Sequence, residues 1–337
     1  MKSVVIFDRY NGVDLKPAEM FNDYVKLTAE SIQSFFLTNS ELNKCTCPGC
    51  GSQQVSTTFE KFGLKYNECE NCGTLYISPR PADNDIVRYY RESPARILWR
   101  ERLTRSTDKT RKNKIVNPRF AWIEDSTLEY LDNQKHYVDI NTDQEVYIEA
   151  IEKSQVFDRK TLINPFLQIN SEKKDLSIVD KGLDSIELEG DVDVVSLFEV
   201  CDHTSDINLL FQKVSQMLQP GGICFITSIL ASGFDFQVLW DKSENLFAPD
   251  RLNVFSVKGF RNLFTRHNFE CLEFSTPGIL DVENVKATAG RNPDVTLPKF
   301  VQNMIVDGDD SVRQAFQEFL QTNLLSSYAR IVIRKNG

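Results

Sequence analysis

The chain has 337 residues, of which 41% are hydrophobic and 26% are charged, a composition typical of globular proteins with one large or two ordinary domains. Its formal net charge of −9 argues against a general nucleic-acid-binding protein, because such proteins carry a basic surface. No apolar run approaches the length of a membrane-spanning helix, and the N-terminal residues lack a signal-peptide pattern. We therefore expect a cytoplasmic protein without membrane segments.

The first part of the chain predicts a short strand and a packing helix. Residues 2–7 form a short β-like run. Residues 16–37 then place apolar side chains at roughly helical spacing, with Pro17 tolerated in the first turn. We interpret this helix as a structural element that packs against the rest of the fold.

Four of the eight cysteines form two Cys-x-x-Cys pairs, Cys47 with Cys50 and Cys69 with Cys72. Each pair is followed by a glycine, and the residues between the pairs, 55–66, read as a β-hairpin. Four thiolates satisfy a tetrahedral Zn²⁺ and leave no open position for water, so this zinc ribbon should serve folding and not catalysis. The alternative is two accidental pairs of reduced cysteines. Cys45 lies just outside the pattern.

Two helical stretches follow the ribbon. Ser78-Pro79-Arg80-Pro81 leads into a predicted helix that ends at Tyr89 and Tyr90, and residues 97–114 form a second, basic helix. The basic helix is expected either to face substrate phosphates or to be a solvated, charged surface. Residues 135–140 and 161–165 then read as strands, with a helix over residues 143–151 between them.

The best-defined stretch spans residues 191–228. Residues 192–198 form an apolar, β-branched run typical of a strand buried on both faces, and residues 206–218 show helical spacing. Pro220-Gly221-Gly222 should end that helix before a second strand at residues 223–228. Strand, helix and strand make a parallel crossover, and ligands bind at the carboxyl end of such strands, where Glu199 and His203 follow.

The C-terminal part contains further regular elements. Residues 269–274 and 326–334 are predicted strands, and residues 311–325 are a predicted helix. The chain shows no internal repeat and no low-complexity segment.

The whole pattern resembles class I S-adenosylmethionine (SAM)-dependent methyltransferases. The residues that carry the resemblance are the run from Asp191 through Glu199 and His203 to the Pro-Gly-Gly turn. Some members of this family, many of which act on nucleotide-linked sugars, also carry a zinc ribbon, a Pro-Arg-Pro element and a basic helix. The resemblance implies an α/β fold with a Rossmann-like seven-stranded sheet.

The resemblance also implies a division into five parts. These are an N-terminal strand and helix (1–44), the zinc ribbon (45–80), a helical connector (81–134), the methyltransferase-like core (135–275) and a C-terminal helix and strand (276–337).

The resemblance further assigns roles to single residues. Asp139, Asn164 and Glu199 would bind the cofactor, and His203 would accept a proton during catalysis. From the residues alone, His203 is equally compatible with capping a helix or with hydrogen bonding in the core. Glu199 is equally compatible with capping backbone N–H groups. Cys201, Cys224 and Cys271 read as buried thiols.

Three departures weaken the expected SAM site. Residues 141–145, where the family has a glycine-rich cofactor loop, contain no glycine. Asn164 replaces the acidic residue that binds both ribose hydroxyls. An amide can accept one hydrogen bond through its oxygen, but it cannot accept two as a carboxylate does. Arg251 stands where related sequences commonly have His.

Two hypotheses remain open. The first is a methyltransferase-like protein with weakened or lost SAM binding that serves as a binding or partner module, with an active homologue or another protein as its partner. The second is an active SAM-dependent methyltransferase that acts on a nucleotide-linked sugar or a similar small polar metabolite.

Overall fold

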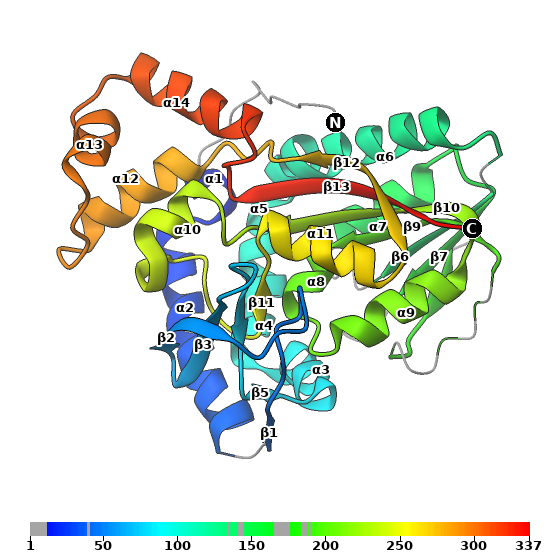
Figure 1. Cartoon of the computed structure of the whole chain (residues 1–337), viewed down its shortest axis with the longest axis horizontal. Helices are drawn as coiled ribbons and strands as arrows, with labels where there is room; N and C mark the ends of the chain where they lie inside the picture. Colours follow the sequence, from blue (N-terminus) through cyan, green and yellow to red (C-terminus); the bar gives the residue numbers. More distant parts are fainter. Residues whose placement is uncertain are drawn as a thin grey trace.

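The computed structural model describes residues 12–38, 41–133, 135–140, 145–164, 176–182, 186, 188 and 190–337. At its centre lies a seven-stranded sheet with the order β12-β13-β10-β9-β6-β7-β8 (Figure 1). The strands are β6 (His136–Ile140), β7 (Arg159–Ile163), β8 (Ser177–Val179), β9 (Val192–Phe198), β10 (Leu218–Ile229), β12 (Phe269–Ser275) and β13 (Tyr328–Lys335). Five neighbouring strands are parallel, and β13 runs antiparallel to both β10 and β12. This confirms the expected Rossmann-like sheet.

The crossover predicted over residues 191–228 is confirmed. All seven residues of β9 are buried, and β9 and β10 are parallel neighbours in the sheet. The connecting helix α9 (Ile207–Met217) begins after Asp206, whose side chain accepts a hydrogen bond from the Leu209 backbone N–H. The Pro-Gly-Gly turn does not end the helix as predicted, because α9 ends at Met217 and β10 begins at Leu218. The turn lies inside β10, where the pairing with β9 shifts register between Leu218 and Ile223.

Helices cover both faces of the sheet and give a three-layer α/β/α arrangement. On one face, β9 and β10 pack with α9 and α11 (Val257–Arg266) in one apolar core. On the other face, α6 (Asn117–Tyr130) and α7 (Glu145–Lys153) pack with the same strands in a second core. Since both faces are covered, the central strand β9 is buried at every position and is mostly apolar.

The N-terminal helices form a separate layer at one end of the sheet (Figure 1). The predicted helix over residues 16–37 appears as α2 (Ala18–Ile32) and the π-helical turn η1 (Gln33–Leu37), preceded by the short α1 (Gly12–Leu15). The helix α3 (Asp83–Glu92) ends before the extended Ser93. The predicted basic helix lies within a continuous run, called here the basic helical run, of α4 (Pro94–Leu98), η2 (Trp99–Thr104), α5 (Arg105–Arg111) and η3 (Lys112–Val116).

The cysteine-bearing hairpin consists of β2 (Val55–Lys61) and β3 (Leu64–Cys69), followed by β4 (Leu75–Ile77). A fourth strand of this sheet, β11 (Asn253–Val254), comes from a distant part of the chain and pairs with β4. Nearby, β1 (Leu42–Asn43) pairs with β5 (Arg80–Pro81). Backbone hydrogen bonds therefore connect the sheet of the cysteine-bearing hairpin to a segment that is distant in the sequence.

The C-terminal part adds a helical group with its own small apolar core. It comprises α10 (Phe234–Leu239), η5 (Trp240–Lys242), α12 (Asp281–Arg291), α13 (Lys299–Val301), η6 (Gln302–Val306) and α14 (Asp310–Thr322). The predicted C-terminal helix and strand are confirmed as α14 and β13. Among the described residues, no helix is both long and apolar enough to cross a membrane.

Candidate functional site: a four-cysteine cluster and a charged cavity

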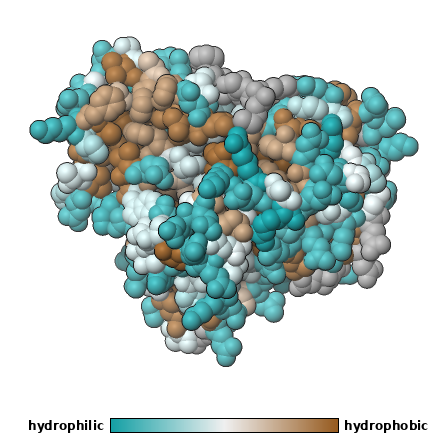
Figure 2. Space-filling model, viewed as in Figure 1, coloured by the Kyte–Doolittle hydropathy of each residue, from teal (hydrophilic) through white to brown (hydrophobic). Residues whose placement is uncertain are grey.

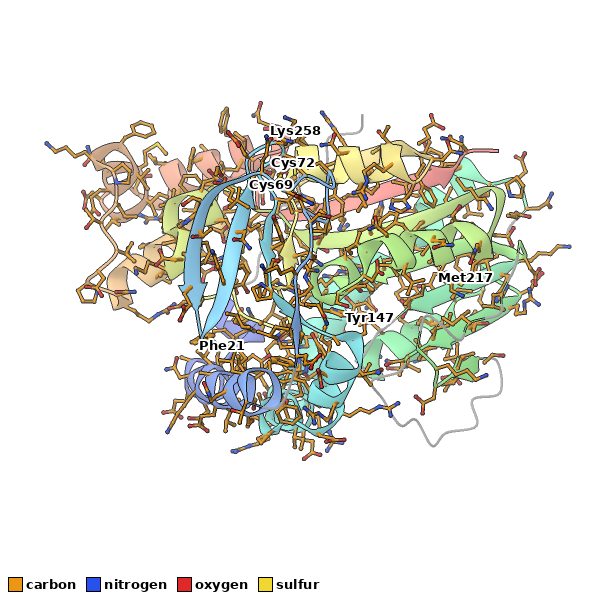
Figure 3. The ribbon with its side chains drawn as sticks, turned by 60° about the horizontal axis from the view of Figure 1, so that its bottom comes forward. Phe21, Cys69, Cys72, Tyr147, Met217 and Lys258 are labelled. Atoms are coloured by element: carbon orange, nitrogen blue, oxygen red, sulfur yellow. The ribbon has the colours of Figure 1, made fainter. Side chains whose placement is uncertain are left out.

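The four cysteines predicted to bind zinc lie together. The ligand atoms of Cys47, Cys50, Cys69 and Cys72 are all within 4.8 Å of one another. The Cys47–Cys72 and Cys50–Cys69 sulfur distances are both 3.5 Å, close to the roughly 3.8 Å edge of a tetrahedron with Zn–S bonds of about 2.3 Å. Cys69 and Cys72 lie side by side in Figure 3. The cluster can therefore hold a zinc ion with four thiolates.

The two cysteine turns are built alike. Gly51 and Gly73 both have a positive φ, 78° and 70°, which a side chain would disfavour. Each donates its N–H to the first cysteine of its pair, from Gly51 to Cys47 O and from Gly73 to Cys69 O, both at 2.8 Å. Each turn thus brings its two thiols to the same side.

A cavity among the described residues has a volume of about 470 Å³. It lies at the carboxyl end of β9, where Phe198 and Glu199 line it, together with His203 from the short helix α8 (Val200–His203). Its other walls come from α1, the basic helical run, α6, α10 and the start of α12. A volume of this size suits a small-molecule ligand.

Glu199 is held between two arginines. Arg251 pairs with it at 2.9 Å and Arg119 at 3.4 Å. Burial alone would raise the pKa of Glu199, but the two guanidinium groups outweigh it and lower that pKa to about 2. Glu199 also has a positive φ of 60°, which is uncommon for a residue with a side chain and is found often at functional sites.

Asp202 is the second acidic partner of Arg251, at 3.3 Å. Its carboxylate also accepts hydrogen bonds from the Ser228 hydroxyl and from the Ile229 N–H. Loss of hydration in this fully buried position raises the pKa of Asp202 to about 7, although Arg251 acts in the opposite direction.

Asp250 organises a second group of polar side chains in the cavity wall. It accepts hydrogen bonds from the hydroxyls of Tyr24, at 2.7 Å, and Tyr90, at 2.5 Å. The Arg96 guanidinium lies 3.4 Å from both of its oxygens. Burial would raise the pKa of Asp250, but Arg96 and the Tyr90 hydroxyl outweigh it, so this pKa is lowered.

His203 lies next to this group, with its ring centroid 5.4 Å from that of Tyr90. Burial lowers the pKa of His203 to about 4, so the imidazole is neutral at physiological pH. A neutral imidazole can accept a proton, but one with such a low pKa is a weak base.

The cavity carries an excess of positive charge in an acidic protein. Four acidic residues, Glu199, Asp235, Asp250 and Asp281, line it together with seven basic ones, Lys16, Arg96, Arg111, Lys114, Arg119, Arg251 and Arg330. The Lys16 ammonium donates a hydrogen bond of 2.7 Å to the neutral amide of Asn245. Burial and the nearby Arg251 and Arg111 lower the pKa of Lys16 to about 8.

The other two predicted cofactor residues do not face this cavity. Asp139, in β6, has no exposed surface and accepts a hydrogen bond of 2.6 Å from Ser196 in β9. Asn164, after β7, is 1% exposed, and its N–H donates to the Val179 carbonyl at 3.0 Å. The glycine-free stretch 141–144 lies outside the described residues.

Arg119 and Tyr147 occupy the space between α6, α7 and the end of β9. Arg119 donates to the Tyr147 hydroxyl at 2.5 Å, and its guanidinium lies 5.3 Å from the centroid of the Phe198 ring. Tyr147 projects from α7 toward the middle of the molecule in Figure 3. Protein side chains therefore fill part of the region next to Glu199.

Of the residues singled out in the sequence, the structure brings Glu199, His203 and Arg251 together in one cavity. Lys16, Arg119 and Asp250 also line the cavity, but the sequence did not identify them as site residues, because none of the three belongs to a local motif. Only the fold brings these distant segments together.

Comparison with known proteins agrees with this fold. Residues 98–273 match the family model described as a methyltransferase domain. No curated protein matches the chain.

Solved structures similar to this chain share little sequence with it. A SAM-dependent methyltransferase of Thermotoga maritima is 13% identical and has a TM-score of 0.41, over 69% of this chain and 97% of that one. A chain of the complex that contains the Haloferax volcanii Trm112 methyltransferase activator is 14% identical and has a TM-score of 0.42, over 68% and 97%. Since the family model spans just over half of the sequence, the chain belongs to the methyltransferase-domain family.

Proposed function

We propose that this chain is a methyltransferase-fold protein with weakened or lost SAM binding, which serves as a binding or partner module. The observation that carries the proposal is the engagement of Glu199 by Arg119 and Arg251. A carboxylate with two guanidinium partners is already neutralised, and a cofactor would have to displace at least one of them.

The state of the other two cofactor positions supports the same proposal. Asp139 is fully buried and accepts a hydrogen bond from Ser196, and Asn164 presents almost no surface. A ribose hydroxyl needs an accessible acceptor, and an amide oxygen is a weaker one than a carboxylate. These residues therefore do not offer the accessible hydrogen-bond acceptors with which the family binds SAM.

Calorimetric titration with SAM and with S-adenosylhomocysteine tests the proposal. We expect a Kd above roughly 1 mM for both, because losing a bidentate carboxylate contact costs about 1.5–3 kcal/mol and displacing an arginine from Glu199 adds a further cost. A micromolar Kd in the unmodified protein would contradict the proposal.

A variant in which the family's cofactor-binding residues are restored provides a second test. It carries glycine at Asn141, Asp143 and Glu145 together with Asn164→Asp, and we expect it to bind SAM at least tenfold more tightly. Asn303→Asp, an exposed change in η6, is the control for an added carboxylate and should leave the affinity unchanged. Equal affinities in all three proteins would mean that these positions do not limit binding.

The second candidate function is an active SAM-dependent methyltransferase for a nucleotide-linked sugar or a similar polar metabolite. The observation that favours it is the cavity, because its seven basic side chains suit a ligand that carries phosphate groups. Glu199 and His203 would then face the substrate, with His203 as proton acceptor.

Uridine diphosphate glucose is a suitable probe for this second function. We expect binding that weakens at least fivefold in Lys16→Met, with Lys258→Met as the control, since Lys258 is exposed on α11. Methyl transfer from SAM to any such acceptor, lost in His203→Ala, would establish this function in place of the first. No binding of the probe would remove its support.

For the cysteine cluster we propose one structural Zn²⁺ per chain, bound by Cys47, Cys50, Cys69 and Cys72. The support is their mutual spacing and the complete set of four thiol ligands. The ion would stabilise the hairpin and take no part in chemistry.

A further inference from the structure

We propose that the outer surface of α13, η6 and α14 docks an amphipathic, basic helix of a partner protein. This surface, called here the C-terminal helical face, is defined by Phe300, Val306, Val312, Phe316 and Phe319. It lies apart from the charged cavity, and the inference does not depend on whether SAM binds.

The first observation is the concentration of exposed apolar side chains. Among the described residues, eight large hydrophobic side chains are exposed, and five of them fall within residues 300–325. Phe300 is 68% exposed and Phe319 is 51% exposed. Figure 2 shows brown surface over α12, α13 and α14 at the upper left. A concentration of this kind on a soluble domain marks an interaction site.

The second observation is the regular arrangement of these side chains. Val312, Phe316 and Phe319 are spaced i, i+4 and i+7 and so form one stripe along α14. The rings of Phe316 and Phe319 stack at 6.2 Å, and Phe316 also packs edge-on against Phe234 of α10 at 4.9 Å. The stripe is therefore anchored to the fold, and it offers a preformed apolar ridge to a helix with complementary spacing.

The third observation concerns charge. Residues 294–318 contain five acidic residues, Asp294, Asp307, Asp309, Asp310 and Glu318, but only two basic ones, Lys299 and Arg313. Arg313 already pairs with Asp310, whose side chain is 97% exposed. An apolar face with an acidic rim complements a partner with an apolar stripe and lysine or arginine at its edges.

The acidic residues argue against two other occupants of this face, a second copy of the chain and a membrane surface. A second copy docked by a twofold axis would place the same acidic residues against each other. The chain as a whole carries a formal charge of −9, which adds to that repulsion. A membrane surface with anionic lipids would be repelled in the same way.

The test uses a synthetic 18-residue helical peptide with leucine on one face and lysine on the other. We expect micromolar binding at low salt, measured by fluorescence anisotropy. The affinity should fall at least tenfold in Phe319→Asp and several-fold in Asp307→Asn, and it should weaken with added salt. Leu128→Asp, at a 58%-exposed position on α6, is the matched control and should bind as the wild type does.

Three results would overturn the inference. One is equal binding of a peptide with glutamate in place of lysine, and another is equal loss of affinity in Leu128→Asp and Phe319→Asp. The third is occupancy by something else, seen as a dimer in sedimentation or as binding to phosphatidylcholine vesicles that Phe319→Asp abolishes. If Phe319→Asp fails to fold, Phe300→Asp replaces it in each comparison.

Discussion

The hydroxyl of Tyr66 donates a hydrogen bond of 2.8 Å to the carbonyl oxygen of Arg251. Tyr66 belongs to the cysteine-bearing hairpin, and Arg251 holds Glu199 and Asp202 in the cavity. The adjacent strand β4 is also paired with β11, two residues beyond Arg251. The cysteine-bearing hairpin therefore supports one wall of the cavity.

This support predicts a specific effect of metal loss. Cys69→Ser should release the zinc and increase amide hydrogen exchange in β11, while exchange in the central strand β9 stays slow. The reason is that β11 pairs with the ribbon, whereas β9 lies inside the main sheet.

Elemental analysis and hydrogen exchange measured by mass spectrometry check this prediction. Cys45→Ser is the control, since Cys45 is outside the cluster, and it should retain about one zinc per chain. Clearly less than one metal in wild-type protein purified without chelator would contradict the site. Unchanged exchange in β11 after metal loss would contradict the link to the cavity.

The Tyr66 hydroxyl should contribute to stability by itself. Tyr66→Phe keeps the ring but leaves the Arg251 carbonyl without this donor, and the free energy of unfolding should fall by about 1–3 kcal/mol. Urea denaturation measures the loss. Zinc content should not change, because the ring and the four cysteines remain in place. A loss below about 0.5 kcal/mol would mean that water replaces the hydroxyl.

Asp250 should be among the most sensitive polar positions. Asp250→Asn leaves Arg96, whose side chain is only 5% exposed, without its buried counter-charge. We expect the free energy of unfolding to fall by about 3–5 kcal/mol.

Tyr24→Phe is the milder companion of this change, because it removes one hydrogen bond to Asp250. It should cost about 1–2 kcal/mol. The two effects should not be additive, because both residues belong to one network. Additive losses in the double variant, measured in urea, would show that the contacts are independent.

The raised pKa of Asp235 predicts that the stability of the fold depends on pH. Loss of hydration and the neighbouring Asp281 carboxylate raise the pKa of Asp235 to about 7 in the folded protein, above its ordinary value near 4. The folded state therefore favours the protonated acid. The contribution is fully present below about pH 4 and is lost as the pH rises to about 7.

Comparison with Asp235→Asn isolates this effect. Relative to the variant, the wild type should lose roughly 4 kcal/mol of unfolding free energy between about pH 4 and pH 7. Contributions from other groups, such as His203, occur in both proteins and cancel in the difference. A constant difference across this pH range would show that Asp235 is ionised throughout.

The sequence by itself determined most of the fold. The apolar run over residues 192–198, the helical spacing after Asp206 and the apolar run before Ser228 each carry a local period that specifies one element. Four cysteines at ribbon spacing likewise predict the cysteine cluster without further information. Local pattern suffices here, because burial on both faces or the tight turn of each cysteine pair constrains each of these segments directly.

The residues that line the cavity could be identified only from the tertiary structure. Lys16, Arg119, Asp250 and Arg251 come from four distant segments, and nothing in their local sequence marks them as neighbours of Glu199. The engagement of Glu199 by two arginines, the burial of Asp139 and Asn164, and the low pKa of His203 follow from the dense surroundings that folding creates. These properties depend on distance and on exclusion of water, and neither quantity is encoded in residue spacing along the chain.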